Sequence, residues 1–500
     1  MGVLYDVIII GGGVVGNAIA RELSRFQVKG AVLEKEPDVG LQTSCRNSGV
    51  VHSGINYKAG TLRAKLDVRG NAMMDKLCSD LKVKIKRIGK LTTALAEEEL
   101  PGIKRLFDQG TANGVPGLEV LDNAAMQKIQ PGVKGIAALW SPTSAIISPY
   151  GLTIALAENA HANGVDYFLN SEVVSIKKDE DGAFTVGIAG GKTYRAKVVI
   201  NSAGLTSDKV SEFAGITKSN TGESLKIWPC RGEYYVLDKR LDGSLKTLIY
   251  PVPGAKDAGL GIHLTPTVDG NILIGPSANY IPDNTPEDYK VTQVVLDDLR
   301  KAGQNLLPQL KMSDFIRNFA GNRPKRTPPE VGGNADFIIE EAEGVKGFIN
   351  IVGIESPGLT SSPSIAEMVR DIVANRIELK EKKDFIAERP GFAGHFCDLP
   401  SDEQERLIKE NPEYGELICR CEKITKKEVR DAIENSLGAR SLVSIKYRAR
   451  SGMGRCQAGF CTPRIVRMLR DEYGFKVEDY LLRGAGSNMF VGNVRDEGVK

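Results

Sequence analysis

The sequence lacks a marked excess of charge of either sign and lacks long apolar runs. Its 500 residues include 66 basic and 63 acidic residues, a formal net charge of +3, so a general role in nucleic-acid binding is not indicated. The opening apolar stretch is interrupted by Asp6 and by glycines and has no basic flank of the kind that precedes a signal peptide. No other stretch is apolar for the length that crosses a bilayer. We therefore expect a cytoplasmic protein that reaches a membrane at most peripherally, through partners.

Histidine is scarce, and cysteine is unevenly distributed. The chain has only four histidines, so each one that falls near a predicted site is a candidate catalytic base. Of the eight cysteines, four form two close pairs in the sequence, Cys419 with Cys421 and Cys456 with Cys461. In an intracellular chain such pairs favour a metal or cluster site over disulfides.

The first residues predict a strand, a glycine-rich turn and a helix. The apolar run 5–10 is typical of a buried parallel strand. It leads into Gly11, Gly13 and Gly16, which match the G-x-G-x-x-G arrangement. In that arrangement the first glycine permits a tight turn, the second lets the backbone approach a pyrophosphate, and the third allows close helix–strand packing. The phosphates would lie at the helix N-terminus. The next apolar run ends at Glu34, about where a ribose-binding acid belongs.

The dinucleotide motif occurs once. A second buried strand is predicted at 197–205, but neither it nor any other segment leads into another G-x-G-x-x-G sequence. A pyridine-nucleotide reductase would need a second dinucleotide site. We therefore expect the chain to bind one dinucleotide and not to reduce NAD directly.

The rest of the first 377 residues mixes strand and helix patterns. The polar, glycine-spaced segment 43–58 is too long for a simple turn, which predicts a ligand-contacting loop. Residues 225–275 alternate apolar and polar positions, which predicts an antiparallel sheet. A second strand–glycine–helix junction is predicted at 347–375, with its helix running from Ser364 to Asn375. Other strands are expected at 83–96, 136–147, 171–176 and 184–188, and other helices at 61–81, 97–113, 151–163 and 287–303.

A cluster of positive charge follows Gly321, where Arg323, Lys325 and Arg326 fall within four residues. A run of charge is usually a solvated surface. Arginine, however, is well suited to hold a carboxylate or phosphate through two parallel hydrogen bonds. Both interpretations remain open for Arg323.

Residues 4–375 resemble the superfamily of FAD-dependent amine and hydroxy-acid oxidoreductases. This family includes glycerol-3-phosphate dehydrogenases, D-amino-acid oxidase and L-2-hydroxyglutarate dehydrogenase. The stretches that carry the resemblance are the loop 11–16 with Glu34, and residues 47–54, 201–204, 321–324 and 353–360. The resemblance implies an α/β fold in which a Rossmann-like FAD-binding domain is joined to an antiparallel-sheet substrate domain. In this family the first loop and its acid hold the ADP half of FAD. The second stretch lines the isoalloxazine, and the last caps the pyrimidine end of the flavin.

The resemblance thus implies one FAD per chain, bound noncovalently. The residues implied to bind it are Gly11, Gly13, Val14, Val15, Gly16, Glu34, Lys35, Thr43, Ser44, Arg46, Asn47, Ser48, Gly49, Val50, His52, Val173, Val174, Ser202, Ala203, Gly204, Gly353, Gly358, Leu359 and Thr360.

The C-terminal part is similar to [2Fe-2S] modules of the bacterioferritin-associated-ferredoxin type. Two irons need four thiolates held in pairs by short loops, and Cys419, Cys421, Cys456 and Cys461 are spaced in this way. A zinc ion would also accept four thiolates and remains an alternative. Cysteines that serve only as core residues are a further alternative, although arginines beside them favour thiolates. A helix is predicted at 425–437 with Thr425 as its N-cap.

The combination of a flavin domain with a cluster domain resembles the catalytic subunits of anaerobic glycerol-3-phosphate dehydrogenases. Two segments, 52–65 and 260–276, look closer to L-2-hydroxyglutarate dehydrogenases. The expected function is therefore oxidation of a small anionic secondary alcohol, either sn-glycerol 3-phosphate, giving dihydroxyacetone phosphate, or a 2-hydroxy acid. Electrons would pass through FAD and the cluster to a protein partner, such as a second flavoprotein subunit. The sequence does not identify the terminal acceptor or the oligomeric state.

Three residues are catalytic candidates. A base must take the hydroxyl proton, and neutral imidazole near pH 7 suits that task, which singles out His52 and His263. An ordinary structural histidine is the alternative for each. Arg323 would hold the carboxylate or phosphate of the substrate. Tyr57, Lys325 and Arg326 are further candidates for substrate binding. A second hypothesis is a non-catalytic electron-transfer subunit that keeps FAD but has lost its substrate site.

The expected domain limits follow from these patterns. Residues 1–377 would form the oxidoreductase, and 378–415, with a charged run and several prolines, would form a linker. Residues 416–485 would form the small α-rich iron–sulfur domain, and 486–500 a tail. Within the oxidoreductase, the FAD-binding parts are expected at about 1–80, 150–215 and 325–377, and the substrate parts at about 81–149 and 216–324.

Overall fold

The computed structural model describes residues 3–253, 261–307, 309–390 and 394–492, and the chain forms two compact units. The first unit comprises residues 1–35 and 39–389, and the second comprises 36–38 and 390–500. Residue 260 of the segment 260–276, residues 391–393 of the expected linker and residues 493–500 of the expected tail lie outside the described residues. Among the described residues, no helix is long and apolar enough to cross a membrane.

The first unit contains a sheet with a parallel centre, as its apolar strands predicted. Strand β1 (Leu4–Ile10) pairs in parallel with β2 (Gly30–Leu33) and β12 (Thr193–Asn201), and β12 pairs in parallel with β20 (Phe348–Val352). The other strands are β9 (Asp166–Phe168), β10 (Val173–Lys178), β11 (Phe184–Ile188) and β19 (Ile338–Glu341). The order is β10-β11-β12-β1-β2-β9, and β20 pairs with β12 and β19. Because β1 is apolar on both faces, it is buried in two separate core clusters.

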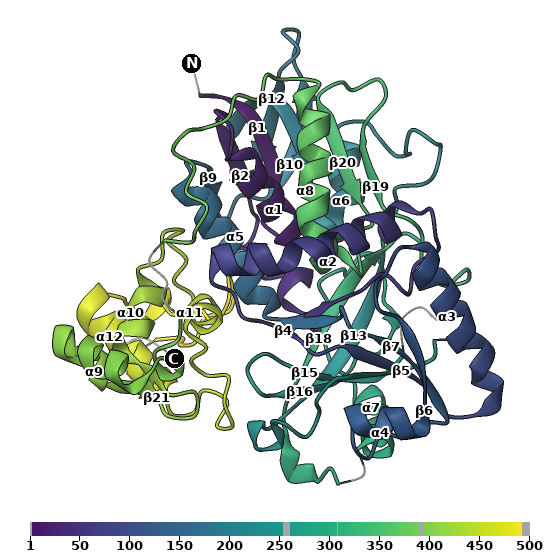
Figure 1. Cartoon of the computed structure of the whole chain (residues 1–500). Coiled ribbons are helices and arrows are strands. Elements are labelled where there is room, and N and C mark those ends of the chain that lie inside the picture. The colour runs from purple at the N-terminus through teal and green to yellow at the C-terminus, as the bar shows by residue number, and fades with distance from the viewer. Residues whose placement is uncertain (1–2, 254–260, 308, 391–393, 493–500) are drawn as a thin grey trace. The chain divides into compact units, whose positions relative to one another are not determined.

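Helices cover this sheet. Helix α1 (Val14–Leu23) lies beside α8 (Gly358–Ala374), and α8 also contacts α2 (Leu62–Leu81), as Figure 1 shows. Helix α5 (Pro149–Ala162) packs against α1, and α6 (Ser207–Phe213) contacts β10, β12 and β20. One large apolar cluster lies between the sheet and α1, α2, α5 and α8.

The prediction that the helix ending near Asn375 begins at Ser364 is wrong. Helix α8 begins six residues earlier, at Gly358, and contains Pro363. Proline lacks the N–H that would bond the carbonyl four residues before it. The hydroxyl of Ser362 instead donates to that carbonyl, of Leu359, at 3.0 Å. The helix therefore continues through a proline that the sequence pattern treated as a boundary.

A second, nine-stranded sheet forms the other half of the first unit. Its order is β17-β13-β16-β15-β14-β5-β7-β6, and β18 pairs with β13. The pairs are antiparallel, as predicted, except for β14 with β5, which are parallel. The strands are β5 (Lys90–Ala94), β6 (Glu119–Asp122), β7 (Ala137–Ser141), β13 (Trp228–Leu237), β14 (Leu248–Pro251), β15 (His263–Pro266), β16 (Ile272–Gly275), β17 (Asn279–Tyr280) and β18 (Phe315–Lys325).

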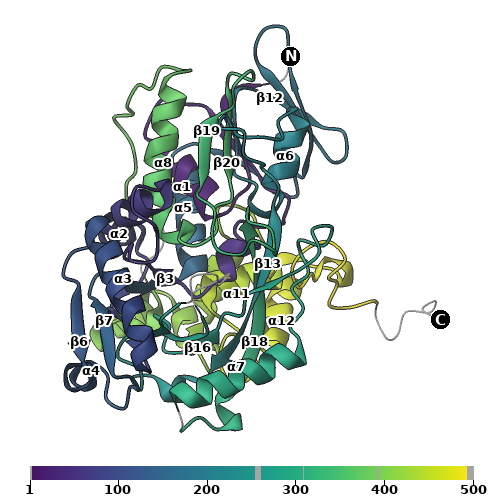
Figure 2. The same ribbon diagram turned by 90° about the vertical axis from the view of Figure 1, so that its right-hand side faces the viewer.

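Three helices accompany the second sheet. Figure 2 shows the long pair β13 and β18 with α7 (Gln293–Leu306) beside them. Helices α3 (Leu100–Ala112) and α4 (Asn123–Ile129) contact β6 and β7. A three-stranded antiparallel sheet, β3 (Val50–Val51), β8 (Ala145–Ile147) and β4 (Ile85–Arg87), completes the unit. Short 3-10 turns occur at Thr43–Cys45, Glu97–Glu99, Gly204–Thr206, Lys239–Leu241 and Met312–Asp314.

The second unit is rich in helix. It contains α9 (Ser401–Glu410), α10 (Lys426–Ile433), α11 (Leu442–Ala449) and α12 (Thr462–Tyr473), a two-stranded sheet of β21 (Leu417–Cys419) and β22 (Ile424–Thr425), and 3-10 turns at Phe396–Asp398, Pro412–Gly415 and Val477–Asp479. Thr425 caps α10 as predicted, and Glu428 completes a reciprocal capping box. Helix α9 falls within the segment expected to be a linker. Its charged run forms helical ion pairs, in which Arg406 binds Glu403 and Glu410.

Candidate active site

A cavity of about 870 Å³ in the first unit is lined by residues from both larger sheets. It brings together most of the residues that the sequence predicted for cofactor and substrate binding. These are Gly11, Gly13, Val14, Val15, Glu34, Lys35, Thr43, Ser44, Arg46, Asn47, Ser48, Val50, His52, Tyr57, Val173, Ser202, Ala203, Gly204, His263, Arg323, Gly358 and Leu359. The predicted residues outside this lining are Gly16, Gly49, Val174, Lys325, Arg326, Gly353 and Thr360.

The three glycines of the first motif, Gly11, Gly13 and Gly16, have different structural roles. Gly11 has a φ of +104°, and a Cβ atom there would lie 2.6 Å from the carbonyl oxygen of Ser202. A Cβ atom at Gly16 would lie 2.0 Å from the Gly11 carbonyl oxygen, so this glycine is needed for helix–strand packing. At Gly13 a Cβ atom would come within 4 Å only of the Ser44 hydroxyl, at 3.1 Å. Since Gly13 lines the cavity, its missing side chain leaves room for a ligand at the start of α1.

The surroundings of this loop fit the ADP half of FAD. Glu34 follows β2, is buried, and accepts a hydrogen bond from the Gly12 N–H at 2.6 Å. The N-cap residue of α1, Gly13, has no side chain to cap the helix, and the first amide, Val14 N–H, donates to the Ser44 hydroxyl at 2.9 Å. A helix N-terminus with a glycine at its cap, beside a buried acid, suits a pyrophosphate and a ribose.

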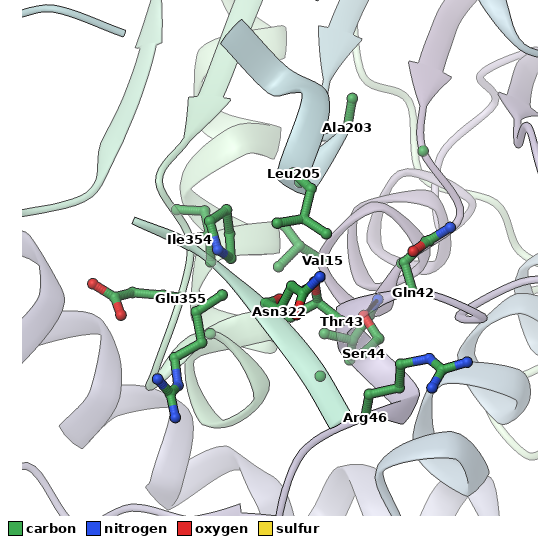
Figure 3. Close-up of a pocket in the computed structure, with 18 of the residues that line it drawn as sticks. Val15, Gln42, Thr43, Ser44, Arg46, Ala203, Leu205, Asn322, Ile354 and Glu355 are labelled. Carbon is green, nitrogen blue, oxygen red and sulfur yellow. Dashed lines mark hydrogen bonds between the residues drawn. The ribbon is translucent and has the colours of Figure 1, made fainter. Parts of the chain in front are cut away.

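The loop that follows is tied to the second sheet. The Thr43 hydroxyl donates to the carbonyl of Asn322 at 2.7 Å, and the Arg46 guanidinium donates to the carbonyl of Ala320 at 3.2 Å. Gly321 allows this approach, because a Cβ atom there would lie 1.9 Å from the Arg46 carbonyl oxygen. In Figure 3, Thr43 and Ser44 lie beside Asn322, with Ala203 and Leu205 above them. The loop and β18 therefore form one continuous wall of the cavity.

Three predicted residues outside the lining, Gly49, Gly353 and Thr360, act through the backbone or through a neighbour. A Cβ atom at Gly49 would lie 2.4 Å from the carbonyl oxygen of Ile147, and one at Gly353 would lie 2.6 Å from the Arg326 side chain. Thr360 accepts a hydrogen bond from the His52 N–H at 2.9 Å and so holds that residue in place. Val174 is exposed.

His52 is buried in the wall of the cavity. Its Nε2 lies 3.2 Å from the Ser356 hydroxyl, which in turn lies 3.0 Å from the hydroxyl of Tyr57. Its Nδ1 has no hydrogen-bond partner among the described residues. Burial, followed by the charge of Lys90, holds the pKa of His52 well below its usual range. The imidazole is therefore neutral near pH 7.

His263 has a defined hydrogen-bond direction. Its Nδ1 lies 2.9 Å from the carbonyl oxygen of Gly261, which can only accept, so Nδ1 carries the proton and Nε2 is free of one in the neutral ring. Nε2 has no partner in the part of the chain that the structure describes. Burial lowers the pKa of His263 to about 3. The ring stacks on Tyr250, with 3.8 Å between ring centroids, which fixes its orientation.

Arg323 faces the cavity from β18. Its Nη2 donates to the carbonyl of Ser277 at 2.7 Å, and its Nη1 to the Cys230 sulfur at 3.5 Å. Burial acts to lower its pKa, but the neighbouring Cys230 and Tyr234 leave it raised. The guanidinium therefore stays charged, while the groups to which it donates, the Ser277 carbonyl and the Cys230 sulfur, are neutral.

Lys325 and Arg326 point elsewhere. The Lys325 ammonium is fully buried and donates to the carbonyl of Gly333 at 2.9 Å, to Asn334 at 2.7 Å and to Glu355 at 3.1 Å. Arg326 pairs with Glu223 at 3.3 Å. All three ammonium protons of Lys325 are thus used within the protein. Arg323 is the cation of this triplet that faces the cavity.

Sequence reasoning missed several residues of the lining. Ser356, which joins His52 to Tyr57, and Glu355, which pairs with Arg63 and Lys325, line the cavity. Both lie in the stretch 353–360, where only the glycines and their neighbours were singled out. Tyr234 and Tyr250 also line it, and their strand positions carried no sign of a ligand.

The four paired cysteines come together in the second unit. The Cys419 and Cys461 thiols share a hydrogen bond, and so do those of Cys421 and Cys456. The first pair is buried and the second is exposed. The hydrogen bond with Cys461 lowers the pKa of Cys419 to about 6. A Cβ atom at Gly454 would lie 2.2 Å from the Cys421 Cβ, so this glycine lets the loop close over the site.

This arrangement suits two irons. Tetrahedral zinc would take four ligands around one centre. Two thiol pairs match a cluster in which each iron takes two thiolates.

Comparisons with known proteins identify a family for each part of the chain. A family model described as FAD dependent oxidoreductase matches residues 6–372, and one described as BFD-like [2Fe-2S] binding domain matches residues 417–471. The chain is 41% identical over 498 residues to a glycerol 3-phosphate dehydrogenase from Caloramator mitchellensis, with 99% of this chain and 100% of that protein covered. It is 31% identical over 420 residues to the mitochondrial L-2-hydroxyglutarate dehydrogenase of Homo sapiens, with 75% and 90% covered.

A solved structure also matches the oxidoreductase part of the chain. Dithionite-reduced L-alpha-glycerophosphate oxidase from Mycoplasma pneumoniae, with FAD bound, matches with a TM-score of 0.70 and 28% identity, covering 77% of this chain and 98% of that chain. These comparisons confirm the predicted fold class and the two predicted cofactors, FAD and a [2Fe-2S] cluster.

Proposed function

The chain belongs to the FAD-dependent oxidoreductase family, and on that premise we propose that it oxidises sn-glycerol 3-phosphate to dihydroxyacetone phosphate. The observation that supports this most is one cavity in which a charged Arg323 and two buried, neutral imidazoles, those of His52 and His263, line the same space as the FAD-binding loop. Such a cavity can hold an anion and take a proton from an alcohol. A relative that is similar over 99% of this chain, including the cluster domain, is a glycerol 3-phosphate dehydrogenase.

Arg323 would hold the phosphate. Its fork of N–H groups can make two parallel bonds to phosphate oxygens, and its charge is not cancelled by a hydrogen-bonded carboxylate in the described residues. Fixing the phosphate fixes the position of the alcohol carbon two bonds further along the substrate. FAD, when bound, supplies the acceptor for the two electrons that leave that carbon.

A histidine would take the hydroxyl proton. Nε2 of His263 is unprotonated and without a hydrogen-bond partner among the described residues, and Nδ1 donates to the Gly261 carbonyl. The negative charge of a bound phosphate would raise the low pKa of this imidazole, which makes it a better proton acceptor once substrate is present. His52, held by Ser356 and Thr360, is the second candidate for the same role.

A second candidate substrate is L-2-hydroxyglutarate. The human mitochondrial dehydrogenase for this acid is 31% identical to the chain, and a carboxylate would bind to Arg323 by the same geometry as a phosphate. Anaerobic mixing of the oxidised protein with glycerol 3-phosphate, L-2-hydroxyglutarate and other 2-hydroxy acids separates the two. We expect the flavin absorbance to bleach fastest with glycerol 3-phosphate at the lowest half-saturating concentration. Faster bleaching by L-2-hydroxyglutarate would reassign the substrate.

A non-catalytic electron-transfer subunit is the alternative of another class. Such a subunit would have no need for two buried neutral histidines and a charged arginine in one cavity, and charged or polar groups are costly to bury without a partner. Failure of every alcohol in the panel to bleach the flavin, while dithionite does so, would favour this alternative.

Electrons would leave through the cluster to a protein partner. The pair Cys421 and Cys456 is exposed, and Arg420, Lys423 and Arg455 are exposed beside it. Positive charge beside a cluster favours the added electron and attracts an acidic surface. We also propose the domain limits given in the sequence analysis, with 1–377 as the oxidoreductase and 416–485 as the cluster domain. The cytoplasmic location stays a prediction.

A further inference from the structure

Two arginines and a phenylalanine form a cluster beside the cysteines of the second unit. The guanidiniums of Arg420 and Arg464 both lie over the Phe460 ring, each 4.4 Å from the ring centre. Arg420 stands between two of the paired cysteines in the chain, and Phe460 directly precedes a third, Cys461. We call Arg420, Phe460 and Arg464 the basic stack. Its members belong to the same segments of the chain as the four thiols.

Neither arginine of the basic stack binds an acidic side chain. Arg464 donates to the carbonyl of Leu417 at 2.7 Å. Arg420 is exposed, and among the described residues it forms no hydrogen bond or ion pair through its side chain. A cation over an aromatic ring keeps its charge while it gains a preferred position. The basic stack therefore holds two positive charges in an ordered arrangement.

Other arginines on the helices of this unit are paired with acids. Arg406 on α9 and Arg430 on α10 each bind two carboxylates, and Arg470 on α12 binds Asp471. An ion pair cancels most of the field that a distant molecule would experience. These three charges are thus neutralised where they lie, and those of the basic stack are not.

The segments around the thiols contain few acids. Residues 450–464 include three arginines and no aspartate or glutamate. The single acid of residues 417–425 is Glu422, which is buried and pairs with Arg450 at 2.9 Å. One of the two thiol pairs is exposed. A molecule that approaches the exposed pair therefore meets a surface on which positive charge predominates.

This charge has two explanations. A cluster held by four thiolates is itself an anion, and nearby positive charge raises its reduction potential. Unpaired surface charge also accelerates encounter with a partner of opposite sign. Arginine and aromatic side chains contribute strongly to protein–protein contacts. An ordered stack with a half-buried ring at its centre favours the second explanation, since offsetting the charge of the cluster requires no such ring.

We propose that the basic stack is the docking surface for an acidic protein that accepts one electron at a time from the cluster. The proposal rests on the proposed function in one respect, the exit of electrons through the cluster. The two guanidiniums attract and orient carboxylates of the partner, and Phe460 supplies an apolar contact between them. In each transfer one electron leaves the reduced cluster and reduces the redox centre of the partner, and no atom is exchanged.

The test uses the full chain loaded with FAD and cluster, and two one-electron acceptors of opposite charge. Plastocyanin is an acidic copper protein, and cytochrome c is a basic haem protein. The chain is reduced with dithionite, freed of excess reductant and mixed anaerobically with each acceptor in a stopped-flow instrument, so no substrate is needed.

Three variants address the stack. Arg420→Met removes one charge from an exposed position, Arg420→Met with Arg464→Met removes two, and Arg420→Lys keeps the charge. If loss of the Arg464 hydrogen bond to Leu417 impairs folding, the single Arg420 variants still give the measurement. The matched control is Arg406→Met with Arg470→Met, which removes two charges from exposed positions in the same unit.

We expect the variants to differ in their rates toward plastocyanin. At about 0.1 M salt, where the Debye length is about 10 Å, Arg420→Met should be roughly threefold slower than the unaltered protein and the double variant roughly tenfold slower. The difference should vanish at about 1 M salt, where the Debye length is about 3 Å. Arg420→Lys and the control should match the unaltered protein, and no variant should be slower toward cytochrome c.

Several results would overturn the proposal. Equal slowing by the control would assign the effect to the overall charge of the unit, and an Arg420→Lys protein as slow as Arg420→Met would exclude electrostatic attraction. Faster reduction of both acceptors would show that the arginines serve only the cluster. Loss of positive charge then lowers the potential of the cluster, which makes it a stronger donor. A redox titration monitored by EPR measures that potential in each variant.

A lipid surface is the other anionic partner that the test covers. Phosphatidylglycerol vesicles that sediment with the unaltered protein but not with the double variant, together with unchanged rates toward plastocyanin, would reassign the basic stack to a membrane surface and overturn the proposal.

The Cys456→Ser variant separates this proposal from the proposed function. If that variant reduces plastocyanin at the unaltered rate and the arginine variants are slow, electrons leave from the flavin; the proposed exit fails and the docking surface stands. If Cys456→Ser is slow and the arginine variants are not, the exit through the cluster stands and the docking surface is refuted.

Discussion

Replacing Arg323 by methionine should weaken substrate oxidation while FAD stays bound. The guanidinium reaches the cavity from the end of β18, whereas the residues around the dinucleotide motif come from the other sheet. Its own hydrogen bonds go to the Ser277 carbonyl and the Cys230 sulfur. Glu355 is near enough to affect its pKa, but that carboxylate is paired with Arg63 and Lys325. The charge is therefore available to a substrate anion.

The expected cost follows from this geometry. Removal of one partner from an enclosed, charge-assisted pair costs about 2–5 kcal/mol. Because Arg323 is half-buried, we take about 3 kcal/mol, which corresponds to a loss of about 150-fold in kcat/KM. Arg323→Lys keeps the charge but loses the fork, so it should recover part of this loss.

The assay is anaerobic stopped-flow bleaching of the flavin by glycerol 3-phosphate over a range of concentrations. The matched control is Arg317→Met, which removes an exposed arginine from the same strand and should leave the rate and half-saturation unchanged. An Arg323→Met protein that retains FAD and bleaches like the unaltered protein would refute the reasoning, since the arginine would then be a surface charge.

Four other changes have defined outcomes. Gly13→Val should abolish FAD retention, because a side chain there would enter the ligand space; yellow protein after purification would contradict this. Ser356→Ala should slow flavin bleaching by roughly fivefold, since a net hydrogen bond is worth about 1 kcal/mol, and an unchanged rate would remove Ser356 from the site. Cys456→Ser should leave flavin bleaching by substrate intact and cut transfer to the partner; equal turnover with the partner would mean that electrons leave from the flavin. Because the pKa of His263 is lowered to about 3, the folded protein binds fewer protons than the unfolded chain below pH 6.5, so stability falls as pH falls. His263→Leu should make that loss about 2 kcal/mol smaller at pH 5, and an identical fall in the thermal unfolding midpoint would count against a buried neutral ring.

The elements that the sequence predicted are those with strong local patterns. Strand β1, the turn at Gly11 and helix α1 follow from an apolar run, glycines and an alanine-rich segment that are adjacent in the chain. Helix α8 was expected to begin too late because Pro363 normally marks a boundary, and the compensating hydroxyl of Ser362 is visible only in three dimensions. Helix α9 was missed because its charges suggested a solvated linker.

The site was predicted in its residue types but not in its connections. His52 and His263 were chosen because histidine is scarce, and both line the cavity. The link from His52 through Ser356 joins residues about three hundred positions apart, which no local pattern encodes. The burial of Lys90 also could not be predicted from the sequence, since a lysine in an alternating strand is usually exposed. Such long-range polar contacts depend on how the two sheets pack.

The most direct test of the account follows electrons from the alcohol to the cluster in one experiment. The oxidised protein, loaded with FAD and cluster, is mixed anaerobically with glycerol 3-phosphate and frozen at intervals for EPR, while a parallel sample records the flavin absorbance. We expect the flavin to bleach first and the signal of a reduced [2Fe-2S] cluster to grow afterwards, with iron and sulfide present in equal amounts. A protein that contains stoichiometric zinc, or whose flavin stays oxidised with every alcohol tested, would contradict the account.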